Sequence, residues 1–439
     1  MAGFQVGVAV RDITPPDGWI REGRIWLWGY GSRTGPCEGV HDPISVRALA
    51  IRDDAGDTLA LAALDLGAVD AGFTDNVRRR VGRTQRIARE NICIHVTHTH
   101  GAPVPVNIPT WQPGFTVPDP EYMALVEDRV VGAIEDACRV TEAATIRFGR
   151  GQTGIAFDRH FGAPGFHDPT LDVLKITDEN DGVIATVFFT ACHPVCMSDF
   201  NKVYADFPGV TRHQVEREMG GAALFVQGYC GISNPVVRDP KTTGLALSDD
   251  VLSVLDGPMQ ELSGPVGAWS SKIQLPFQPL PVVSVRERAM NAGGIHARWA
   301  AAMAAADERI PDVLPVELQL FRIGAGPGAW FLAASSHEVT SDFAAPVRSL
   351  RPDDHVTPIA FSNSEISYVP SVNVLSGPER CDTFPFCENY EGGISFAWYG
   401  HRAPLAMDVD TRFVEGSAAL FARVCDGVDR GGNVDSNAD

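Results

Sequence analysis

Short runs of β-branched and apolar residues alternate along this chain with segments of helical periodicity, and this alternation most constrains the fold. The strand-like runs lie at 4–10, 45–52, 58–64, 92–97, 183–191 and 222–227. The helical patterns lie near 72–90, 120–139 and 208–219. Several strand-like runs follow one another with no helix between them, which favours a mixed sheet over a purely parallel one. The pattern therefore predicts an α/β fold with one large mixed β-sheet flanked by helices.

The second half of the chain adds further elements to this prediction. Helices are expected at 286–308, 338–349 and 411–425, and strands at 315–323 and 329–334. Long loops rich in Pro, Gly, Asn or Ser are expected at 102–119, 233–248 and 362–393. No internal repeat or low-complexity linker divides the chain, so we expect one domain over residues 1–425 and a flexible tail over 426–439.

Charge and hydropathy narrow the classes of partner. The 36 Lys and Arg against 55 Asp and Glu give a formal net charge of −19, which disfavours nucleic acid as a partner. No window reaches the roughly 18 apolar residues of a transmembrane segment, and the N-terminus lacks a secretory signal. A cytoplasmic location is therefore expected. The 9 cysteines show neither zinc-ribbon nor disulfide-framework spacing, so reduced thiols are expected, with a Cys381–Cys387 bridge as the alternative.

A pair of histidines directly follows the strand-like run near 92–96, in the segment Thr97-His98-Thr99-His100-Gly101. Because alternate residues of an extended chain share a face, His98 and His100 are expected to point the same way where the strand opens into a loop. Imidazole is the commonest ligand for zinc. Such a pair also occurs in cores where it only forms hydrogen bonds, so a second group of residues is needed.

A second histidine motif, His193-Pro194, ends the strand-like run at 183–191. The segment Asp206-Phe207-Pro208-Gly209 then predicts a turn that opens the next helix. The strand at 222–227 runs into the glycine-rich segment 228–235. Histidines thus end two separate strands, and a glycine-rich turn follows a third.

The order of these motifs resembles the neutral ceramidase family. Its catalytic domain carries a Thr-His-Thr-His-Ser-Gly-Pro segment, a later His-Pro, an Asp-Tyr-Pro-Gly turn and a Gly-Asp-Val-Ser-Pro segment. Residues Gly29-Tyr30-Gly31, 39–42 and Arg47-Ala48 look like the N-terminal signature of the family. Three later segments resemble its Pro-Gly-Glu, Tyr-x-x-Tyr-Val-Thr-Thr and Tyr-Glu-Gly segments, in that order: 334–339, 363–370 and 389–393.

The resemblance implies a zinc ion held by four residues: His98, His193, Glu338 and Tyr368. It also implies that three residues face the substrate: His100, Arg159 and Tyr390. In this interpretation, zinc-bound water attacks the carbonyl of a carboxamide, either a lipid such as ceramide or a smaller N-acyl compound. His100 is expected to act as general acid and base, because the pKa of histidine lies near the operating pH. Arg159 and Tyr390 are expected to donate hydrogen bonds to the developing oxyanion.

The sequence departs from the family pattern in the glycine-rich segment, which reads Gly231-Ile232-Ser233-Asn234-Pro235. Asn234 stands where the family has a serine, and its amide is expected to hydrogen-bond the substrate or an oxyanion. His337 also stands where a glycine is usual before the ligand glutamate. The chain is expected to lack the C-terminal β-sandwich domain of ceramidases, which favours a small amide or ester as substrate.

Three alternatives to the zinc amidase remain open at this point. The same scaffold suits a zinc-dependent esterase or lactonase. Cys230 or Ser233 in the glycine-rich turn is a candidate nucleophile with a histidine as base, although no Gly-x-Ser-x-Gly motif supports it. A non-catalytic zinc-containing binding protein is the third. The sequence gives no indication of the oligomeric state.

Overall fold

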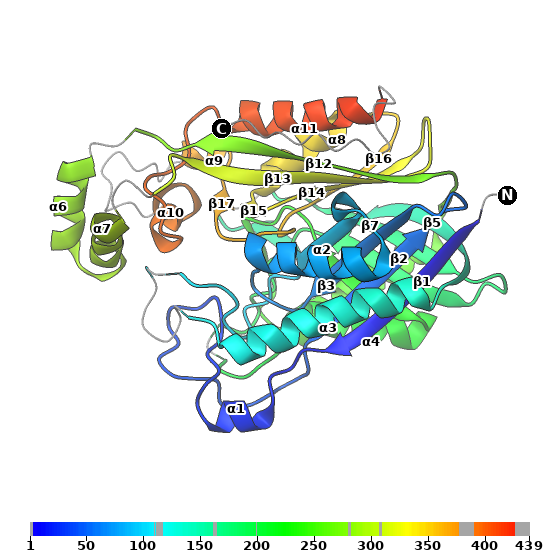
Figure 1. Ribbon diagram of the computed structural model, residues 1–439, viewed down its shortest axis with the longest axis horizontal. Helices are drawn as coiled ribbons and strands as arrows, with labels where there is room; N and C mark the ends of the chain where they lie inside the picture. The colour runs from blue at the N-terminus through cyan, green and yellow to red at the C-terminus, as the bar shows by residue number, and fades with distance from the viewer. Residues whose placement is uncertain are drawn as a thin grey trace.

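The largest sheet of the protein has nine strands and mixes parallel with antiparallel pairs, as seen in the computed structural model (Figure 1). The structure describes residues 3–108, 110, 117–160, 165–198, 200–279, 282–306, 310–376 and 390–425. The predicted tail at 426–439 lies outside these residues. A single domain over residues 1–425 remains a prediction.

The strands of the large sheet follow the order β4-β3-β2-β1-β5-β7-β8-β9, with β11 paired to β5. Their bounds are Phe4–Asp12 for β1, Ser45–Arg52 for β2, Thr58–Leu64 for β3, Ile92–Val96 for β4, Glu142–Gln152 for β5, Thr170–Thr177 for β7, Val183–Thr190 for β8, Ala222–Gln227 for β9 and Gln260–Leu262 for β11. The β3–β4 and β8–β9 pairs are parallel and the others are antiparallel, which confirms the mixed sheet.

A second sheet, of four strands, packs against the first. The sequence did not predict this second sheet as a separate layer. Its strands run in the order β12 (Val266–Pro276), β13 (Val313–Ile323), β14 (Trp330–Ser335) and β16 (His355–Ile359). The core between the sheets joins Leu61 and Phe189 of the large sheet to Phe321, Trp330 and Leu332 of the second. These apolar faces bury one another, as stacked sheets do.

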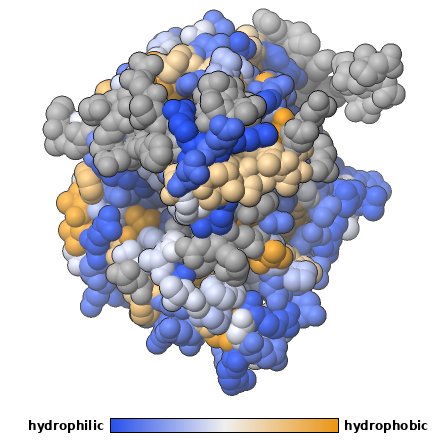
Figure 2. All heavy atoms as spheres, turned by 90° about the vertical axis from the view of Figure 1, so that its left-hand side faces the viewer, coloured by the Kyte–Doolittle hydropathy of each residue, from blue (hydrophilic) through white to orange (hydrophobic). Residues whose placement is uncertain are grey.

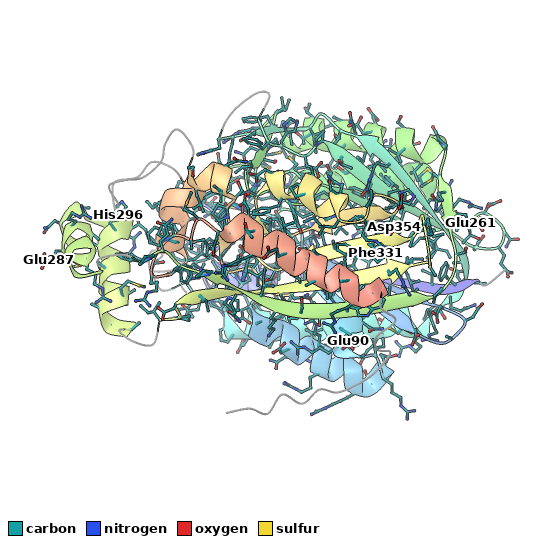
Figure 3. All side chains as sticks on the ribbon, turned by 90° about the horizontal axis from the view of Figure 1, so that it is seen from above. Glu90, Glu261, Glu287, His296, Phe331 and Asp354 are labelled. Atoms are coloured by element: carbon teal, nitrogen blue, oxygen red, sulfur yellow. The ribbon has the colours of Figure 1, made fainter. Side chains whose placement is uncertain are left out.

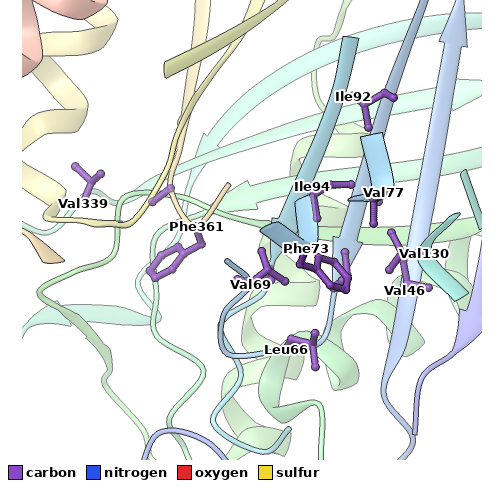
Figure 4. Close-up of a cluster of buried hydrophobic side chains, with 14 of the residues drawn as sticks. Val46, Leu66, Val69, Phe73, Val77, Ile92, Ile94, Val130, Val339 and Phe361 are labelled. Carbon is purple, nitrogen blue, oxygen red and sulfur yellow. The ribbon is translucent and has the colours of Figure 1, made fainter. Parts of the chain in front are cut away.

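Helices cover the outer faces of both sheets. Helix α3 (Pro120–Arg139) packs on β1 and β2 with α2 (Ala71–Gln85) beside it (Figure 1). Helix α4 (Asp206–Met219) covers β9, and α5 (Pro240–Asp256) covers β5 and β7. The buried side chains under α2 and α3 include Phe73, Val77 and Val130 (Figure 4). Helix α11 (Val409–Cys425) crosses the four-stranded sheet, where Phe421 contacts Phe331 (Figure 3).

Local sequence signals explain where two of these helices begin. The carboxylate of Asp119 accepts a hydrogen bond from Tyr122 N at 2.9 Å at the start of α3, and Asp239 accepts one from Thr242 N at 2.7 Å at the start of α5. A proline occupies the first position of each helix, where its missing N–H is tolerated. The predicted loop at 233–248 is therefore wrong, because it contains β10 (Ser233–Pro235) and most of α5.

Two helix predictions in the second half also need correction. The helix predicted over 286–308 is broken into α6 (Val282–Ala292) and α7 (Gly294–Ala306), because Gly293 and Gly294 adopt φ of 74° and 55°. The pair projects from one end of the molecule, where Glu287 and His296 mark it (Figure 3). The helix predicted over 338–349 begins only at α8 (Ala344–Ser349), since Glu338 and Val339 form strand β15.

Figure 2 shows the side of the molecule that carries α6, α7 and α10 (Ser395–Trp398), where hydrophilic residues predominate and hydrophobic ones form separate patches. No helix within the described ranges is long and apolar enough to span a membrane. Six cysteines are described with their side chains, and all are buried and free: Cys37, Cys93, Cys138, Cys192, Cys196 and Cys230. Cys381 and Cys387 lie outside the described residues.

Curling of the large sheet brings its two edge strands together beneath the candidate site. The backbone N–H of Gln227 at the end of β9 donates to His95 Nε2 on β4 at 2.8 Å, although the two strands lie at opposite ends of the strand order. Strands β4 and β8 are followed by His98 and His193, and both histidines lie close to Glu338 in the segment that follows β14.

Candidate metal centre

His98 is held in a strained backbone conformation directly after β4. Its φ is 63°, a left-handed value that non-glycine residues seldom adopt and that clusters at functional sites. The imidazole is buried, with its Nδ1–H donating to the carbonyl of Gly67 at 2.5 Å. The ring packs on Phe361 with a centroid distance of 4.4 Å, at the edge of the core in Figure 4. This hydrogen bond leaves the lone pair of Nε2 free to bind a metal ion.

His193 follows the end of β8 and is oriented in the same way. Its Nδ1–H donates to the carbonyl of Ser233 at 3.1 Å, and its backbone N–H donates to the same oxygen at 2.9 Å. The ring lies 5.3 Å from that of His98 and is almost fully buried. The carbonyl fixes the tautomer, so that Nε2 of His193 is again the nitrogen left to act as a ligand.

Glu338 comes from the short parallel pair of β15 (Glu338–Val339) and β17 (Tyr368–Val369). Its backbone N–H donates to Ser367 O at 2.9 Å, and its side chain is fully buried. The preceding residue, His337, has a φ of 70°, which turns the chain sharply after β14. A helix start was expected here, whereas a strand pairing positions the carboxylate.

The ligand atoms of His98, His193 and Glu338 all lie within 4.8 Å of one another. Nε2 of His193 is 2.5 Å from Glu338 Oε1, and Nε2 of His98 is 3.6 Å from Glu338 Oε2. Glu338 Oε2 is buried and has no hydrogen-bond partner. Two lone pairs and an unsatisfied buried carboxylate oxygen facing one point match the His, His and Glu ligands of catalytic zinc sites.

The electrostatic state of these three groups suits a cation between them. Burial lowers the pKa of His98 to about 4 and that of His193 to about 3, so that both rings are neutral at pH 7. Burial also raises the pKa of Glu338 to about 7, because a carboxylate in this position lacks water. A bound divalent cation would favour the ionised carboxylate and the neutral imidazoles together.

Tyr368 lies beside this group, at the position predicted for the fourth ligand. It faces Glu338 across the β15–β17 pair, and its hydroxyl accepts a hydrogen bond from Arg159 Nη2 at 3.1 Å. Burial raises the pKa of the Tyr368 phenol, while the charge of Arg159 opposes that rise. Its role as a ligand remains a prediction.

Arg159, predicted to face the substrate, is anchored on all sides by protein acceptors. Its Nε donates to Glu391 Oε1 at 2.6 Å, its Nη2 to Gly231 O at 2.9 Å and its Nη1 to Asn234 Oδ1 at 3.3 Å. The guanidinium also lies 5.7 Å from the ring centroid of Tyr390. The sequence motif at 389–393 contains Glu391 but gives no sign of its ion pair with Arg159.

His100 lies next to the metal-binding group, with its Nε2 3.3 Å from Nε2 of His98. Burial, followed by the neighbouring His98 and His193, lowers the pKa of His100 well below its ordinary value. The expectation that its pKa lies near neutrality is therefore wrong for this environment. Burial therefore favours the neutral form of the ring.

The residues proposed as alternative nucleophiles lie away from the pocket. The Ser233 hydroxyl is fully buried and shares a hydrogen bond with Ser341 Oγ at 2.7 Å. Cys230 is also fully buried, and burial raises the pKa of its thiol, which suppresses the nucleophilic thiolate. Asn234 on β10, by contrast, lines the pocket and is held in register opposite Phe157 of β6 (Ala156–Asp158).

A pocket of about 330 Å³ opens beside the metal-binding group. Six of its lining residues were predicted as site residues: His100, Arg159, His193, Asn234, Tyr368 and Tyr390. The other six had no predicted role: Gly29, Tyr30, Gly31, Val195, Arg238 and Trp398. The Gly-Tyr-Gly motif at 29–31 belongs to the N-terminal family signature, and this signal could have identified it as part of the pocket.

The fold and this site define a class: an α/β protein with a large mixed sheet and a buried His–His–Glu group beside an open pocket. The sequence profile described as neutral/alkaline non-lysosomal ceramidase, N-terminal, matches residues 4–232. The chain belongs to this family.

Individual relatives agree with this assignment. The chain is 26% identical over 314 residues to the neutral ceramidase of Mycobacterium tuberculosis, an alignment that covers 60% of this chain and 47% of that protein. It is 24% identical over 266 residues to the neutral ceramidase of Drosophila melanogaster, covering 55% of this chain and 37% of that protein. The matched regions thus span less than half the length of these relatives.

Two solved structures share the fold. The crystal structure of neutral ceramidase from Pseudomonas aeruginosa superposes with a TM-score of 0.74 at 17% identity, covering 97% of this chain and 75% of that one. A ceramidase complexed with C2 gives a TM-score of 0.76 at 16% identity, covering 99% and 77%. At this identity the likeness confirms the predicted fold, while the site rests on its own geometry.

Proposed function

We propose that this protein is a zinc-dependent hydrolase that cleaves the carboxamide bond of an N-acyl compound. The observation that supports this most is the convergence of His98 Nε2, His193 Nε2 and the unpartnered Glu338 Oε2 next to an open pocket. Membership of the ceramidase family favours an amide as the bond that is cleaved. Tyr368 is the proposed fourth ligand.

In the proposed reaction, the metal and the protein side chains would have different roles. A zinc ion in such a site supplies Lewis-acid polarisation of a carbonyl and a water-derived nucleophile near neutral pH. Arg159 and Tyr390 line the pocket and are positioned to donate hydrogen bonds to the carbonyl oxygen as its charge grows. The amide of Asn234, held by Arg159, orients the substrate on the adjoining wall.

His100 is the proposed proton carrier. Its ring is neutral at pH 7 and can accept a proton at a ring nitrogen, and its Nδ1 is buried without a hydrogen-bond partner. Because the pKa of this imidazole is lowered, the imidazolium releases its proton readily to the departing amine. The water-poor position beside His98 and His193 favours such a transfer within the site.

A turnover experiment with a chelator tests this proposal. The purified protein, loaded with zinc, is incubated with short N-acyl amines, and the released amine is measured. We expect activity that is lost on chelation, restored by zinc, and absent in His193→Ala. Cys230→Ala is the matched control and should retain activity. Activity that survives complete removal of metal, or that disappears only in Cys230→Ala, would refute the zinc mechanism.

A further inference from the structure

The walls of the pocket carry positive charge without negative charge. Its charged lining residues are Arg159 and Arg238, and no aspartate or glutamate among the described residues lines it. This contrasts with the chain as a whole, whose formal net charge is −19. A single-sign cluster against an opposite background indicates selection of a ligand by charge.

Arg159 is poorly suited to bind a second anion, because its charge is already compensated and only one Nη1–H remains for the scissile carbonyl. Its charge is compensated by Glu391 at 2.6 Å, and further donors engage Gly231 O, Asn234 Oδ1 and Tyr368 OH. The ion pair is largely buried, with side-chain exposures of 22% and 3%. An additional anion would compete with Glu391, so Arg159 does not explain the charge of the pocket.

Arg33 provides a buried positive charge directly behind the pocket wall. It is 5% exposed, donates to the carbonyls of Trp28 and Phe200, and forms no ion pair within the described part of the chain. Its guanidinium lies 4.8 Å from the ring centroid of Tyr30, which lines the pocket. In a medium of low dielectric constant, this charge acts across the wall on whatever enters the pocket.

Arg238 provides an accessible positive charge on the same pocket. It follows β10, whose Asn234 lines the pocket as well, and precedes the cap of α5. The side chain is exposed and, within the residues that the structure describes, has neither an ion-pair partner nor a hydrogen-bond acceptor. An ordinary solvated arginine would also be exposed, but Arg238 in addition lines the pocket that contains His193 of the candidate metal site.

We propose that the substrate is an N-acyl compound that carries a carboxylate or a similar anionic group outside the scissile amide, and that Arg238 binds this group. This inference rests on the proposed amide hydrolysis and names its substrate class. The buried charge of Arg33 attracts the anion, while Arg238 supplies donors that it can contact. The volume of about 330 Å³ lies near the lower end of the roughly 300–1,000 Å³ typical of small-molecule pockets, which suits a compact substrate.

Matched substrate pairs test the proposal in the zinc-loaded protein. In the first pair, N-octanoyl glycinate is compared with N-octanoyl ethanolamine, which replaces the carboxylate on the amine side by a hydroxymethyl group. In the second pair, an acyl chain that ends in a carboxylate is compared with the same chain ending in a methyl group. We expect kcat/KM to favour the anionic member of at least one pair, and to do so less at high salt.

Two variants separate the role of Arg238 from an effect of net charge. Arg238→Gln should raise KM for the preferred anionic substrate about fivefold, the upper range for a partly exposed ion pair, and should change KM for the neutral substrate by a smaller factor. Arg129→Gln is the matched control: an exposed arginine on α3 that does not line the pocket. It should leave both substrates unchanged.

Binding of the anionic probes to chelator-treated protein, measured by calorimetry, distinguishes failure of this inference from failure of the proposed function. Binding that Arg238→Gln weakens, without turnover of any probe in the zinc-loaded protein, would support the anion site and refute the amide hydrolysis. Turnover without preference for an anion, or a preference that Arg238→Gln leaves intact, would overturn the anion site alone. Neither binding nor turnover would overturn both.

Discussion

Replacing Glu391 by glutamine should destabilise the protein and impair its site, because this carboxylate compensates the charge of Arg159. The two side chains are 2.6 Å apart, and Glu391 is only 3% exposed. Removing one partner of a buried ion pair costs about 3–5 kcal/mol, since the remaining charge stays buried. Arg159 is 22% exposed and keeps acceptors at Asn234, Gly231 and Tyr368, so we expect roughly 2–3 kcal/mol.

This cost translates into a measurable change in melting temperature. An unfolding entropy of about 2.1 cal/mol/K per residue gives roughly 0.9 kcal/mol/K for 439 residues, so Tm should fall by about 3 °C. Glu261→Gln is the matched control, because Glu261 pairs with Arg147 at 3.6 Å and the side chains are 47% and 32% exposed. That variant should lower Tm by less than about 1 °C.

Calorimetric melting of the wild type, Glu391→Gln and Glu261→Gln, all in the same buffer, provides the comparison. We also expect kcat of Glu391→Gln to fall about 10- to 100-fold, because Arg159 loses the partner that orients it. If Glu391→Gln melted within 1 °C of Glu261→Gln and kept its kcat, the ion pair would not be what positions Arg159.

Two further predictions concern a contact and a titration. Gly29 has a φ of 96°, and a Cβ added there would lie 2.2 Å from His100 Nδ1. Gly29→Ala should therefore lower kcat without loss of zinc. Gly35→Ala is the control and should leave kcat unchanged, because its Cβ meets nothing within 4 Å. Zinc loss from Gly29→Ala would contradict this. Burial lowers the pKa of His95 to about 3 in the folded protein. As the pH falls, the unfolded chain therefore binds a proton at His95 before the folded protein does. The free energy of unfolding should then fall by up to about 2 kcal/mol between pH 6.5 and pH 5. Urea titrations should show a shallower fall in His95→Gln, and equal slopes would contradict the assignment.

The sequence predicted the mixed sheet because strand-like runs are local patterns, and it predicted the candidate metal ligands from a resemblance to family motifs. The runs at 45–52 and 222–227 coincide with β2 and β9, since an apolar strand ending at a glycine or charged residue is recognisable without its neighbours. His98, His193 and Glu338 came from the order of family motifs, and the structure brings them together. Their assignment as zinc ligands is the part that stays a proposal.

What the sequence did not predict depends on contacts between distant segments. Burial lowers the pKa of His100, and that burial arises from Tyr30 and other residues far from it in the chain. Arg238 was placed in a loop, and only the folded chain puts it on the pocket with Trp398. Glu338 has the sequence context of a helix start, yet its pairing with Tyr368 makes it a strand residue. Long-range pairing overrode the local pattern there.

The metal content of the purified protein tests the central proposal most directly. Elemental analysis of the wild type should find zinc close to stoichiometric with the chain, and His98→Ala and Glu338→Ala should lose it while remaining folded by circular dichroism. His41→Ala, an exposed histidine outside the site, serves as the control and should retain zinc. Absence of zinc from the wild type even after incubation with the metal, or its retention in both site variants, would contradict the proposed metal centre.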